Sequence, residues 1–288
     1  MSHTSMTQPT VVITGASTGI GEACALELDR RGFRVFAGVR SPSAAEKLRA
    51  KASSRLTVVT IDVTDIASIT AAADTVTTAV GDTGLAGLVN NAGIVVPGPL
   101  EAVPIDALRR QLEVNVIGHV AVTQAFLPLL RTAQGRVVNM SSANGGLSVP
   151  CLGPYAASKW ALEAINDALR QELRRFGIRV SSIVPGAIST PIWKKSSAAG
   201  EELFKNVSPE VLALYEADLA AVREFVARSV RSASPIDRVV RAVVHALTAE
   251  RPKTHYYLGW DVRVCFKGMK MLSDRVRDWI VRKLVGLS

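Results

Sequence analysis

The chain opens with a short apolar strand that runs directly into a glycine-rich turn and then a helix. The strand is the β-branched run Thr10 to Thr14, and the turn has the spacing GxxxGxG from Gly15 to Gly21. The helix keeps its apolar residues on one face and stops at Gly32. Glycines let backbone amides approach phosphate oxygens, and a helix N-terminus favours negative charge. This order predicts a phosphate-binding turn, the alternative being a turn without a ligand; its residues are Gly15, Ser17, Thr18, Gly19, Ile20 and Gly21.

The pattern of the remaining chain extends this unit into a sheet. The turn is neither the GxGxxG fingerprint of dinucleotide folds nor a GxxxxGK[ST] phosphate loop, because no lysine follows. Strand and helix patterns alternate, with further strands predicted at residues 34–39, 56–61, 87–90, 136–139 and 179–184. Such alternation argues for a parallel sheet with helices on both faces. We therefore expect an α/β fold with a single doubly wound, Rossmann-type parallel sheet in one domain, residues 1–288.

Length and composition suit a globular protein. The chain has 288 residues, 48% hydrophobic and 20% charged, which fits one large α/β domain or two small ones. No apolar run reaches about 18 residues, the length of a membrane span, and residues 1–10 lack the apolar core of a signal peptide. The three cysteines are widely spaced, and the four histidines have no metal-ligand spacing. We expect a cytoplasmic protein without a protein-bound metal.

The ends of the second and third strands carry candidate readers of a cofactor. In dinucleotide folds an acid about 20 positions beyond the glycine loop accepts a hydrogen bond from the 2′-hydroxyl of NAD. Here the strand ends in Arg40-Ser41, and no acid occurs before Glu46. Arg40 offers paired donors for a 2′-phosphate and Ser41 a hydroxyl, which favours NADP(H); the alternative is an exposed loop arginine. Asp62, followed by Val63, either meets the adenine ring or caps the next helix.

The stretch from Asn139 to Lys159 holds the main candidate for chemistry. Tyr155 and Lys159 stand four residues apart at the start of a helical pattern, so their side chains share one face. A cation within a few Å favours the phenolate and lowers the phenol pKa from its usual value of about 10. The pair could then exchange a proton near neutral pH. Alone it is a weak signal, because a helix surface with a snorkelling lysine has the same spacing.

Five motifs in register resemble the short-chain dehydrogenase/reductase family. Their order and spacing hold over residues 10–191. The motifs are TGASTGIG at Thr14–Gly21, NNAG at Asn90–Gly93, Asn115, Ser142 with Tyr155 and Lys159, and PGxIxT at Pro185–Thr190.

The resemblance implies a role for each motif. Tyr155 would exchange a proton with the substrate oxygen, and Ser142 would hydrogen-bond the same oxygen. Lys159 would lower the pKa of Tyr155 and bind the nicotinamide ribose, while Asn115 would hold a water in a relay to Lys159. The hydride would pass between the nicotinamide and the substrate carbon, which is chemistry that the cofactor supplies. Further cofactor contacts would come from Asn91, Ala92, Gly93, Pro185, Gly186, Ile188 and Thr190.

Residues 191–234 follow the last cofactor motif and are predicted to form a substrate lid. The lid carries Trp193, and Leu147, Val149 and Leu152 are expected to complete an apolar wall; the alternative for such residues is core packing. A fixed polar centre with apolar walls suits a hydrophobic alcohol or ketone of steroid, retinoid or aliphatic type. Residues 251–261 (RPKTHYYLGWD) resemble the retinol and hydroxysteroid dehydrogenase branch of the family.

The C-terminal tail, residues 265–288, is amphipathic and basic. It could lie on a membrane surface, but docking on its own core or a partner subunit is favoured. Lys and Arg exceed Asp and Glu by 9 (34 minus 25), yet no recognised module or aromatic interleaving indicates nucleic acid. The predicted apolar face of the tail is Met269, Leu272, Val276, Trp279, Ile280 and Leu284.

The assembly and the function each have alternatives. We expect a homo-oligomer, dimer or tetramer. The rival functions are the same chemistry with NAD(H) and a catalytically silent, dinucleotide-sensing scaffold.

Overall fold

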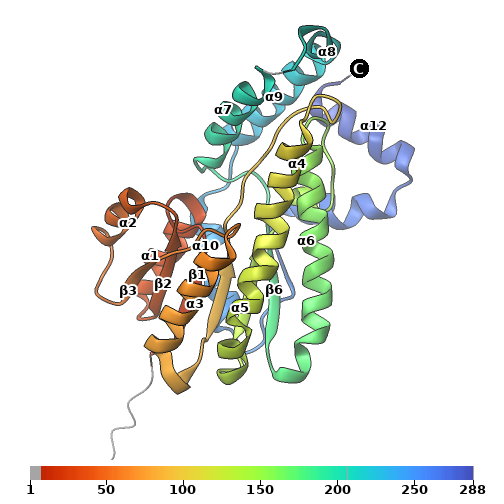
Figure 1. Ribbon diagram of the computed structural model, residues 1–288. Coiled ribbons are helices and arrows are strands. Elements are labelled where there is room, and N and C mark those ends of the chain that lie inside the picture. Colours follow the sequence, from red (N-terminus) through yellow and green to blue (C-terminus); the bar gives the residue numbers. More distant parts are fainter. Residues whose placement is uncertain (1–7, 206, 288) are drawn as a thin grey trace, which may run out of the picture.

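The computed structural model describes residues 8–205 and 207–287 (Figure 1). Most of the N-terminal segment on which the signal-peptide expectation rested, residues 1–7, lies outside the described part. The side chains of residues 265 and 270 are likewise not described.

In the part of the chain that the structure describes, seven parallel strands form one sheet in the order β3-β2-β1-β4-β5-β6-β7. The chain reverses its direction across the sheet between β1 and β4, and in such sheets ligands bind at the carboxyl edge near this point. The predicted doubly wound parallel sheet is therefore confirmed. The strands are β1 (Thr10–Ile13), β2 (Arg34–Val39), β3 (Leu56–Thr60), β4 (Gly87–Asn90), β5 (Arg136–Met140), β6 (Arg179–Pro185) and β7 (His255–Leu258).

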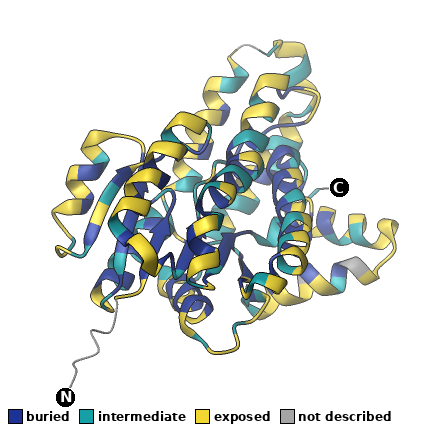
Figure 2. Cartoon of the chain, turned by 60° about the horizontal axis from the view of Figure 1, so that its bottom comes forward, coloured by how far each residue is buried: buried dark blue, intermediate teal, exposed yellow. Residues whose placement is uncertain are grey.

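Helices cover both faces of the sheet (Figure 1). One face packs against α1 (Gly19–Arg30), α2 (Pro42–Arg49) and α10 (Ile236–Thr248). The other packs against α3 (Ile66–Val80), α5 (Gly118–Thr132) and α6 (Gly153–Glu172). The strands read as near-continuous apolar runs because both of their faces are buried, and Figure 2 shows the sheet as the dark, buried layer of the molecule.

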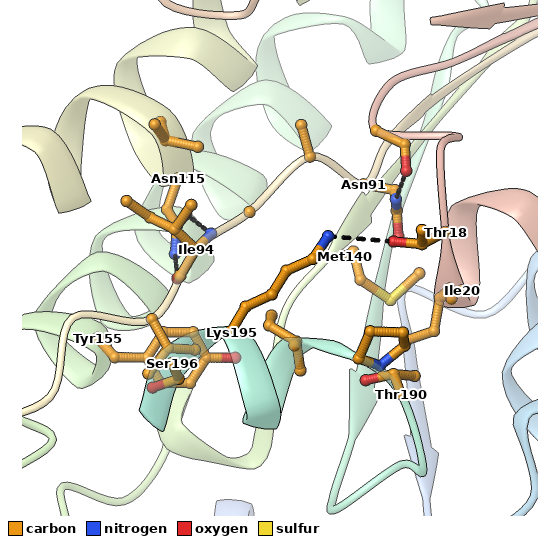
Figure 3. Close-up of a pocket in the computed structure, with 18 of the residues that line it drawn as sticks. Thr18, Ile20, Asn91, Ile94, Asn115, Met140, Tyr155, Thr190, Lys195 and Ser196 are labelled. Carbon is orange, nitrogen blue, oxygen red and sulfur yellow. Dashed lines mark hydrogen bonds between the residues drawn. The ribbon is translucent and has the colours of Figure 1, made fainter. Parts of the chain in front are cut away.

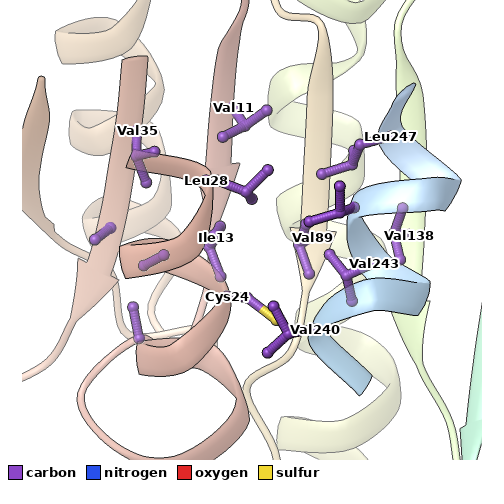
Figure 4. Close-up of a cluster of buried hydrophobic side chains, with 14 of the residues drawn as sticks. Val11, Ile13, Cys24, Leu28, Val35, Val89, Val138, Val240, Val243 and Leu247 are labelled. Atoms are coloured by element: carbon purple, nitrogen blue, oxygen red, sulfur yellow. The ribbon is translucent and has the colours of Figure 1, made fainter. Parts of the chain in front are cut away.

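The cluster between the sheet and α1 with α10 fixes the position of the glycine turn. Cys24 and Leu28 of α1 meet Val240 and Val243 of α10 over the valines of the central strands (Figure 4). Leu28 and Val243 are fully buried, at 0% exposure. Burying side chains of this size stabilises the fold by about 1.5–3 kcal/mol each, so the N-terminus of α1 is held firmly at the carboxyl edge of β1.

A long helical segment crosses the opposite face. The helix α4 (Ile105–Leu112) continues through a π-helical turn, Glu113–Ile117, into α5. By length and composition alone, residues Ile105–Thr132 could span a membrane, with a mean hydropathy of 1.3, although no apolar run of that length was expected from the sequence. Val122, Phe126 and Leu130 of this segment are fully buried in the core. The segment is therefore a core helix of this fold.

Three helices form the predicted lid segment above the carboxyl edge of the sheet (Figure 1). They are α7 (Ile192–Phe204), α8 (Pro209–Leu214) and α9 (Glu216–Arg231). Trp193 anchors the first of them, because its indole Nε1–H donates to the carbonyl of Ile188 at 3.1 Å. The lid is thus tied directly to the loop that follows β6.

The short helix α11 (Trp260–Arg263) precedes the tail, and within the tail α12 (Asp274–Val285) packs beside α9. Val281 and Val285 face the protein and are buried, whereas Trp279 is 61% exposed. The apolar face predicted for the tail is therefore divided. Helix α12 begins only at Asp274, and it docks through Val281 and Val285, which the predicted stripe did not include. Met269 is buried and Ile280 packs against the core, while the exposed members are Leu272, Val276, Trp279 and Leu284.

Candidate active site

A cavity of about 510 Å³ opens at the carboxyl edge of the sheet, between the strand ends and the lid. Figure 3 shows side chains from the glycine turn, the β4 end, the π-helical turn, α6 and α7 converging on it. All predicted cofactor residues except Gly21 and Ser41 line this cavity. They are Gly15, Ser17, Thr18, Gly19, Ile20, Arg40, Asp62, Val63, Asn91, Ala92, Gly93, Tyr155, Lys159, Pro185, Gly186, Ile188 and Thr190.

The glycine turn is locked by close backbone approaches. A Cβ on Gly21 would lie 2.3 Å from the carbonyl oxygen of Gly15, and a Cβ on Gly15 would lie 2.8 Å from Cα of Ala92. The Asn91 side chain donates from Nδ2 to the carbonyls of Thr14 and Gly15, both at 3.1 Å. The turn is therefore held open toward the cavity at the N-terminus of α1, and this cradle fits the diphosphate of a dinucleotide. Gly21 does not line the cavity, but its missing side chain leaves room for the Gly15 carbonyl.

Two guanidinium groups flank the far end of the cavity. Arg40 follows β2, and Arg110 projects from α4. Burial raises the pKa of the Asp62 carboxyl, but hydrogen bonds from Thr64 and the charges of Arg40 and Arg110 together bring it below its usual value. Asp62 Oδ1 accepts from the backbone N–H of Thr64 at 3.0 Å and from its hydroxyl at 2.8 Å. Asp65, not Asp62, caps α3, so the capping alternative for Asp62 is wrong.

Ser41 caps the N-terminus of helix α2 and does not line the cavity. Its hydroxyl accepts from the backbone N–H of Ala44 at 3.4 Å as the N-cap of α2, and the residue is exposed. A serine before Pro42 is a favourable helix start. The structure therefore leaves Arg40 as the predicted 2′-phosphate reader that faces the cavity.

Asn115 lies in the π-helical turn and is fully buried. Its Oδ1 accepts from the N–H of Ile94 at 2.9 Å, and its Nδ2 donates to the carbonyl of Ile94 at 3.0 Å and to Ser158 Oγ at 3.1 Å. The extra residue of a π-turn places this side chain inward, as is common at functional sites. Asn115 thus pins the loop after β4 to α6, beside Lys159.

Ser142, Tyr155 and Lys159 meet at the inner wall of the cavity. Lys159 Nζ donates to the carbonyl of Met140 at 2.8 Å and lies 5.8 Å from the centroid of the Tyr155 ring. Ser142 begins the short turn after β5, where its Oγ accepts from the N–H of Asn144 at 3.2 Å. The end of β5 and the first turns of α6 therefore bring the three predicted groups together.

The pKa of Tyr155 in the structure differs from the value that the sequence predicted for a tyrosine beside Lys159. Burial raises the pKa of the Tyr155 phenol above its usual value, and a hydrogen bond with Ser142 opposes this effect only in part. Burial also lowers the pKa of Lys159 to about 8, against the stabilising charge of Glu163. The predicted lowering of the Tyr155 pKa is thus wrong, because desolvation by burial is the larger effect on the phenol. A neutral phenol beside a cation is suited to donate a proton.

The structure separates the predicted substrate residues. Trp193 lines the cavity, whereas Leu147, Val149 and Leu152 do not. These three pack behind the cavity wall, in a buried cluster that joins Val95 and Tyr155 of the cavity to Val222 of α9 and the inward face of α12, as in the core-packing alternative. The apolar wall is formed by residues that the sequence analysis did not select: Val95, Val96, Ile192 and Ala199.

A lid lysine also escaped prediction. Lys195 lines the cavity, and its Nζ lies 3.5 Å from Thr18 Oγ1 at the glycine turn, as the dashed line in Figure 3 shows. Its N–H bonds to the carbonyl of Pro191, one turn earlier, and Pro191 packs 3.5 Å from the position of a Gly19 Cβ. The sequence signal was its place one helical turn after the PGxIxT motif.

Comparison of the sequence with known proteins identifies the family of this chain. The model of the short chain dehydrogenase family matches residues 9–201. The chain belongs to the short-chain dehydrogenase family. Mouse retinol dehydrogenase 5 is 38% identical over 277 residues, covering 94% of this chain and 87% of the mouse protein. Bovine 17-beta-hydroxysteroid dehydrogenase type 6 is 39% identical over 279 residues, covering 95% and 87%. The resemblance to the retinol and hydroxysteroid branch is therefore confirmed, and the chain is an oxidoreductase acting on CH–OH groups.

Solved structures of the family extend over nearly the whole chain. A Burkholderia cenocepacia short chain dehydrogenase in complex with NADP is 26% identical with a TM-score of 0.71, covering 96% of this chain and 97% of that one. A Burkholderia phymatum family member in complex with NAD is 26% identical with a TM-score of 0.77, covering 92% and 95%. One of these two structures holds NADP and the other holds NAD. Both therefore bind a nicotinamide dinucleotide, but they differ in whether that dinucleotide carries a 2′-phosphate.

Proposed function

We propose that this protein transfers a hydride between NADP(H) and a hydrophobic alcohol or ketone, with Tyr155 as the proton donor or acceptor. The main support for this proposal is that Ser142, Tyr155 and Lys159 line one cavity. The glycine turn and Arg40 line the far end of the same cavity. The bound nicotinamide would supply the hydride chemistry. The glycine turn would hold its diphosphate, and Ile188 and Thr190, which line the same cavity, would contact the carboxamide.

Each catalytic side chain has a distinct task in this scheme. Ser142 and Tyr155 would bind the substrate oxygen through their hydroxyls and so orient the carbonyl carbon. Tyr155, neutral because of its burial, would release its proton to the developing alkoxide. Lys159 would stabilise the phenolate that remains. Asn115 would act by holding the loop of Ile94 against α6; a water-relay role for it stays a prediction.

The preference for NADP(H) rests on charge at the adenosine end. Arg40 and Arg110 both line the cavity near Asp62, and charge-assisted bonds from a guanidinium suit a phosphate. We expect Arg40→Ala to weaken NADP binding by about 10- to 100-fold and to leave NAD binding unchanged, because only the 2′-phosphate loses its partner. Fluorescence titration of both cofactors measures this.

Arg49→Ala is the matched control for that experiment. Arg49 ends α2, is exposed, and lies outside the cavity lining, so its removal lowers the net charge equally without touching the site. Equal losses of NADP affinity in the two variants, or equal binding of NAD and NADP by the unmodified protein, would remove Arg40 from this role and favour the NAD(H) alternative.

The substrate class follows from the wall of the cavity. Val95, Val96, Ile192 and Trp193 surround the polar centre, and two relatives are named for retinol and a hydroxysteroid. We expect lipophilic ketones and alcohols to exceed small hydrophilic sugars in kcat/KM by at least about 100-fold. A cofactor-consumption screen measures this, with Tyr155→Phe as the blank. Sugars turning over as well as steroid-like or retinoid-like compounds would overturn the assignment.

The cellular setting stays a prediction. A cytoplasmic location and a homo-oligomeric state rest on the sequence alone. Contact with a membrane surface would have to use the outward face of α12, where Trp279 and Leu284 are exposed. Docking is favoured because Val281 and Val285 of the same helix are buried against the lid.

A further inference from the structure

A buried acid stands one helical turn beyond the catalytic lysine. Glu163 lies four residues after Lys159 on α6, and its side chain is only 9% exposed. Glutamate is rarely buried unless its charge is compensated, because desolvation of a carboxylate costs several kcal/mol. The reaction scheme above gives Glu163 no task, so its burial calls for an explanation.

Hydrogen bonds from two strands hold this carboxylate. Ser182 of β6 donates from Oγ to Glu163 Oε1 at 2.6 Å, and His255 Nε2 of β7 lies 2.9 Å from Oε2. Burial raises the pKa of Glu163, but the hydrogen bonds, led by that from His255, outweigh it and keep the pKa below its usual value. Glu163 is therefore an anion at neutral pH.

The charge of Glu163 acts on Lys159 across the helix surface. Residues four apart on a helix are neighbours, and the glutamate raises the pKa of Lys159 against the lowering effect of its burial. The Nζ group itself is bonded to the neutral carbonyl of Met140. His119, on the other side of Lys159, has its pKa lowered to about 3 by burial and by the lysine charge, so it adds no charge at neutral pH.

We propose that Glu163 is a positioning residue whose negative charge keeps the buried Lys159 protonated, and that it thereby sets the upper pH limit of proton transfer by Tyr155. This inference rests on the proposed function, because it assigns the pH dependence of the same site. Strands β6 and β7 stabilise the negative charge of Glu163 through the hydrogen bonds of Ser182 and His255.

Other charged groups border the carboxylate on the side of the tail. The ring of His255 stacks on Tyr257 with centroids 5.7 Å apart, and Lys267 Nζ lies 5.5 Å from the Tyr257 centroid. Burial, Glu163 and Asp167 raise the pKa of Tyr257, and Arg263 opposes them. Of these groups, His255 acts on the carboxylate directly, because its hydrogen bond and its charge both lower the pKa of Glu163.

The sign of the pH effect follows from the charge on Lys159. Ketone reduction needs Tyr155 protonated and Lys159 charged, so activity should fall as the pH rises through the pKa of Lys159, about 8. Removing the carboxylate charge lowers that pKa further. In Glu163→Gln the alkaline limb of kcat/KM should therefore move to lower pH by about one unit.

Ser182→Ala is the matched control. It removes a hydrogen bond to the same carboxylate but leaves the carboxylate charge, so its alkaline limb should stay in place even if the fold is equally destabilised. Glu163→Asp keeps the charge on a shorter side chain and should restore most of the unmodified profile. Circular dichroism and thermal melts check that all three variants fold.

A second readout does not depend on turnover. NMR titration of 13C-labelled lysine, with Lys159→Arg used to assign the signal, follows the ionisation of Lys159 itself. Its midpoint should move to lower pH in Glu163→Gln and stay in place in Ser182→Ala. A loss of turnover in every protein with the titration shift intact would refute the proposed function but not the charge coupling. An unshifted titration, or equal shifts in both variants, would overturn the role of Glu163.

Discussion

Replacing Tyr155 by phenylalanine is expected to lower kcat by between about 100-fold and 10,000-fold while NADP binding stays unchanged. The substitution keeps the buried ring, which is 8% exposed, and removes only the hydroxyl that exchanges the proton. Because the ring packs in the cluster of Leu147 and Leu152, the variant should fold normally. Steady-state turnover and cofactor titration on the same preparation separate the two effects.

Tyr256→Phe provides the same chemical change away from the cavity. Tyr256 belongs to β7, and its hydroxyl bonds to His245 Nδ1 of α10 at 2.8 Å and accepts from the N–H of Lys253 at 3.1 Å. This variant should melt at a lower temperature and keep its kcat. If the two phenylalanine variants retained similar activity, Tyr155 would lose its catalytic role.

Replacing Gly21 by alanine is expected to abolish measurable NADP binding, a loss of at least about 100-fold. The new Cβ would lie 2.3 Å from the Gly15 carbonyl oxygen and 2.5 Å from Asn91 Nδ2. Gly15 belongs to the turn and Asn91 holds the turn from the end of β4, so the turn must move away from the position that cradles the diphosphate. Such overpacking also destabilises the fold by about 1–3 kcal/mol. Calorimetric cofactor titration and thermal melts measure the two losses.

Gly268→Ala separates this steric effect from glycine replacement in general. A Cβ on Gly268 would meet its nearest atom, Val264 Cγ1, at an ordinary 3.7 Å, and the residue lies in the tail, outside the cavity lining. It should bind NADP as the unmodified protein does. Tight NADP binding by Gly21→Ala would show that the turn does not hold the diphosphate.

The fold was predictable because it follows from local periodicity. Each parallel strand is buried on both faces, so runs such as those at Thr10 and Arg179 carry their own signal. Since the carboxyl ends of parallel strands share one edge, the placing of Arg40, Asp62 and Ser142 in a single cavity followed from the same reading.

The parts that escaped prediction depend on long-range packing. Leu147 and Leu152 lie beside Tyr155 in sequence, but the docking of α12 turns them into core. The valine face of α12 could be identified only once the partner helix α9 was in place. Similarly, the spacing of Tyr155 and Lys159 shows the cation but not the desolvation, which raises the pKa of the phenol instead of lowering it. The placement of Lys195 and Glu163 depends on contacts with Thr18 and His255, which lie far away in the chain.

The central claim is that hydride and proton transfer occur together in the cavity of Tyr155. Its most direct test is transfer of deuterium from NADPH labelled at C4 of the nicotinamide to lipophilic ketones, followed by mass spectrometry of the product alcohol. We predict that the unmodified protein places the label from one face of the nicotinamide on the carbinol carbon, and that Tyr155→Phe places almost none. Bound NADPH that delivers no label to any ketone of the series, or equal labelling by Tyr155→Phe, would contradict the account.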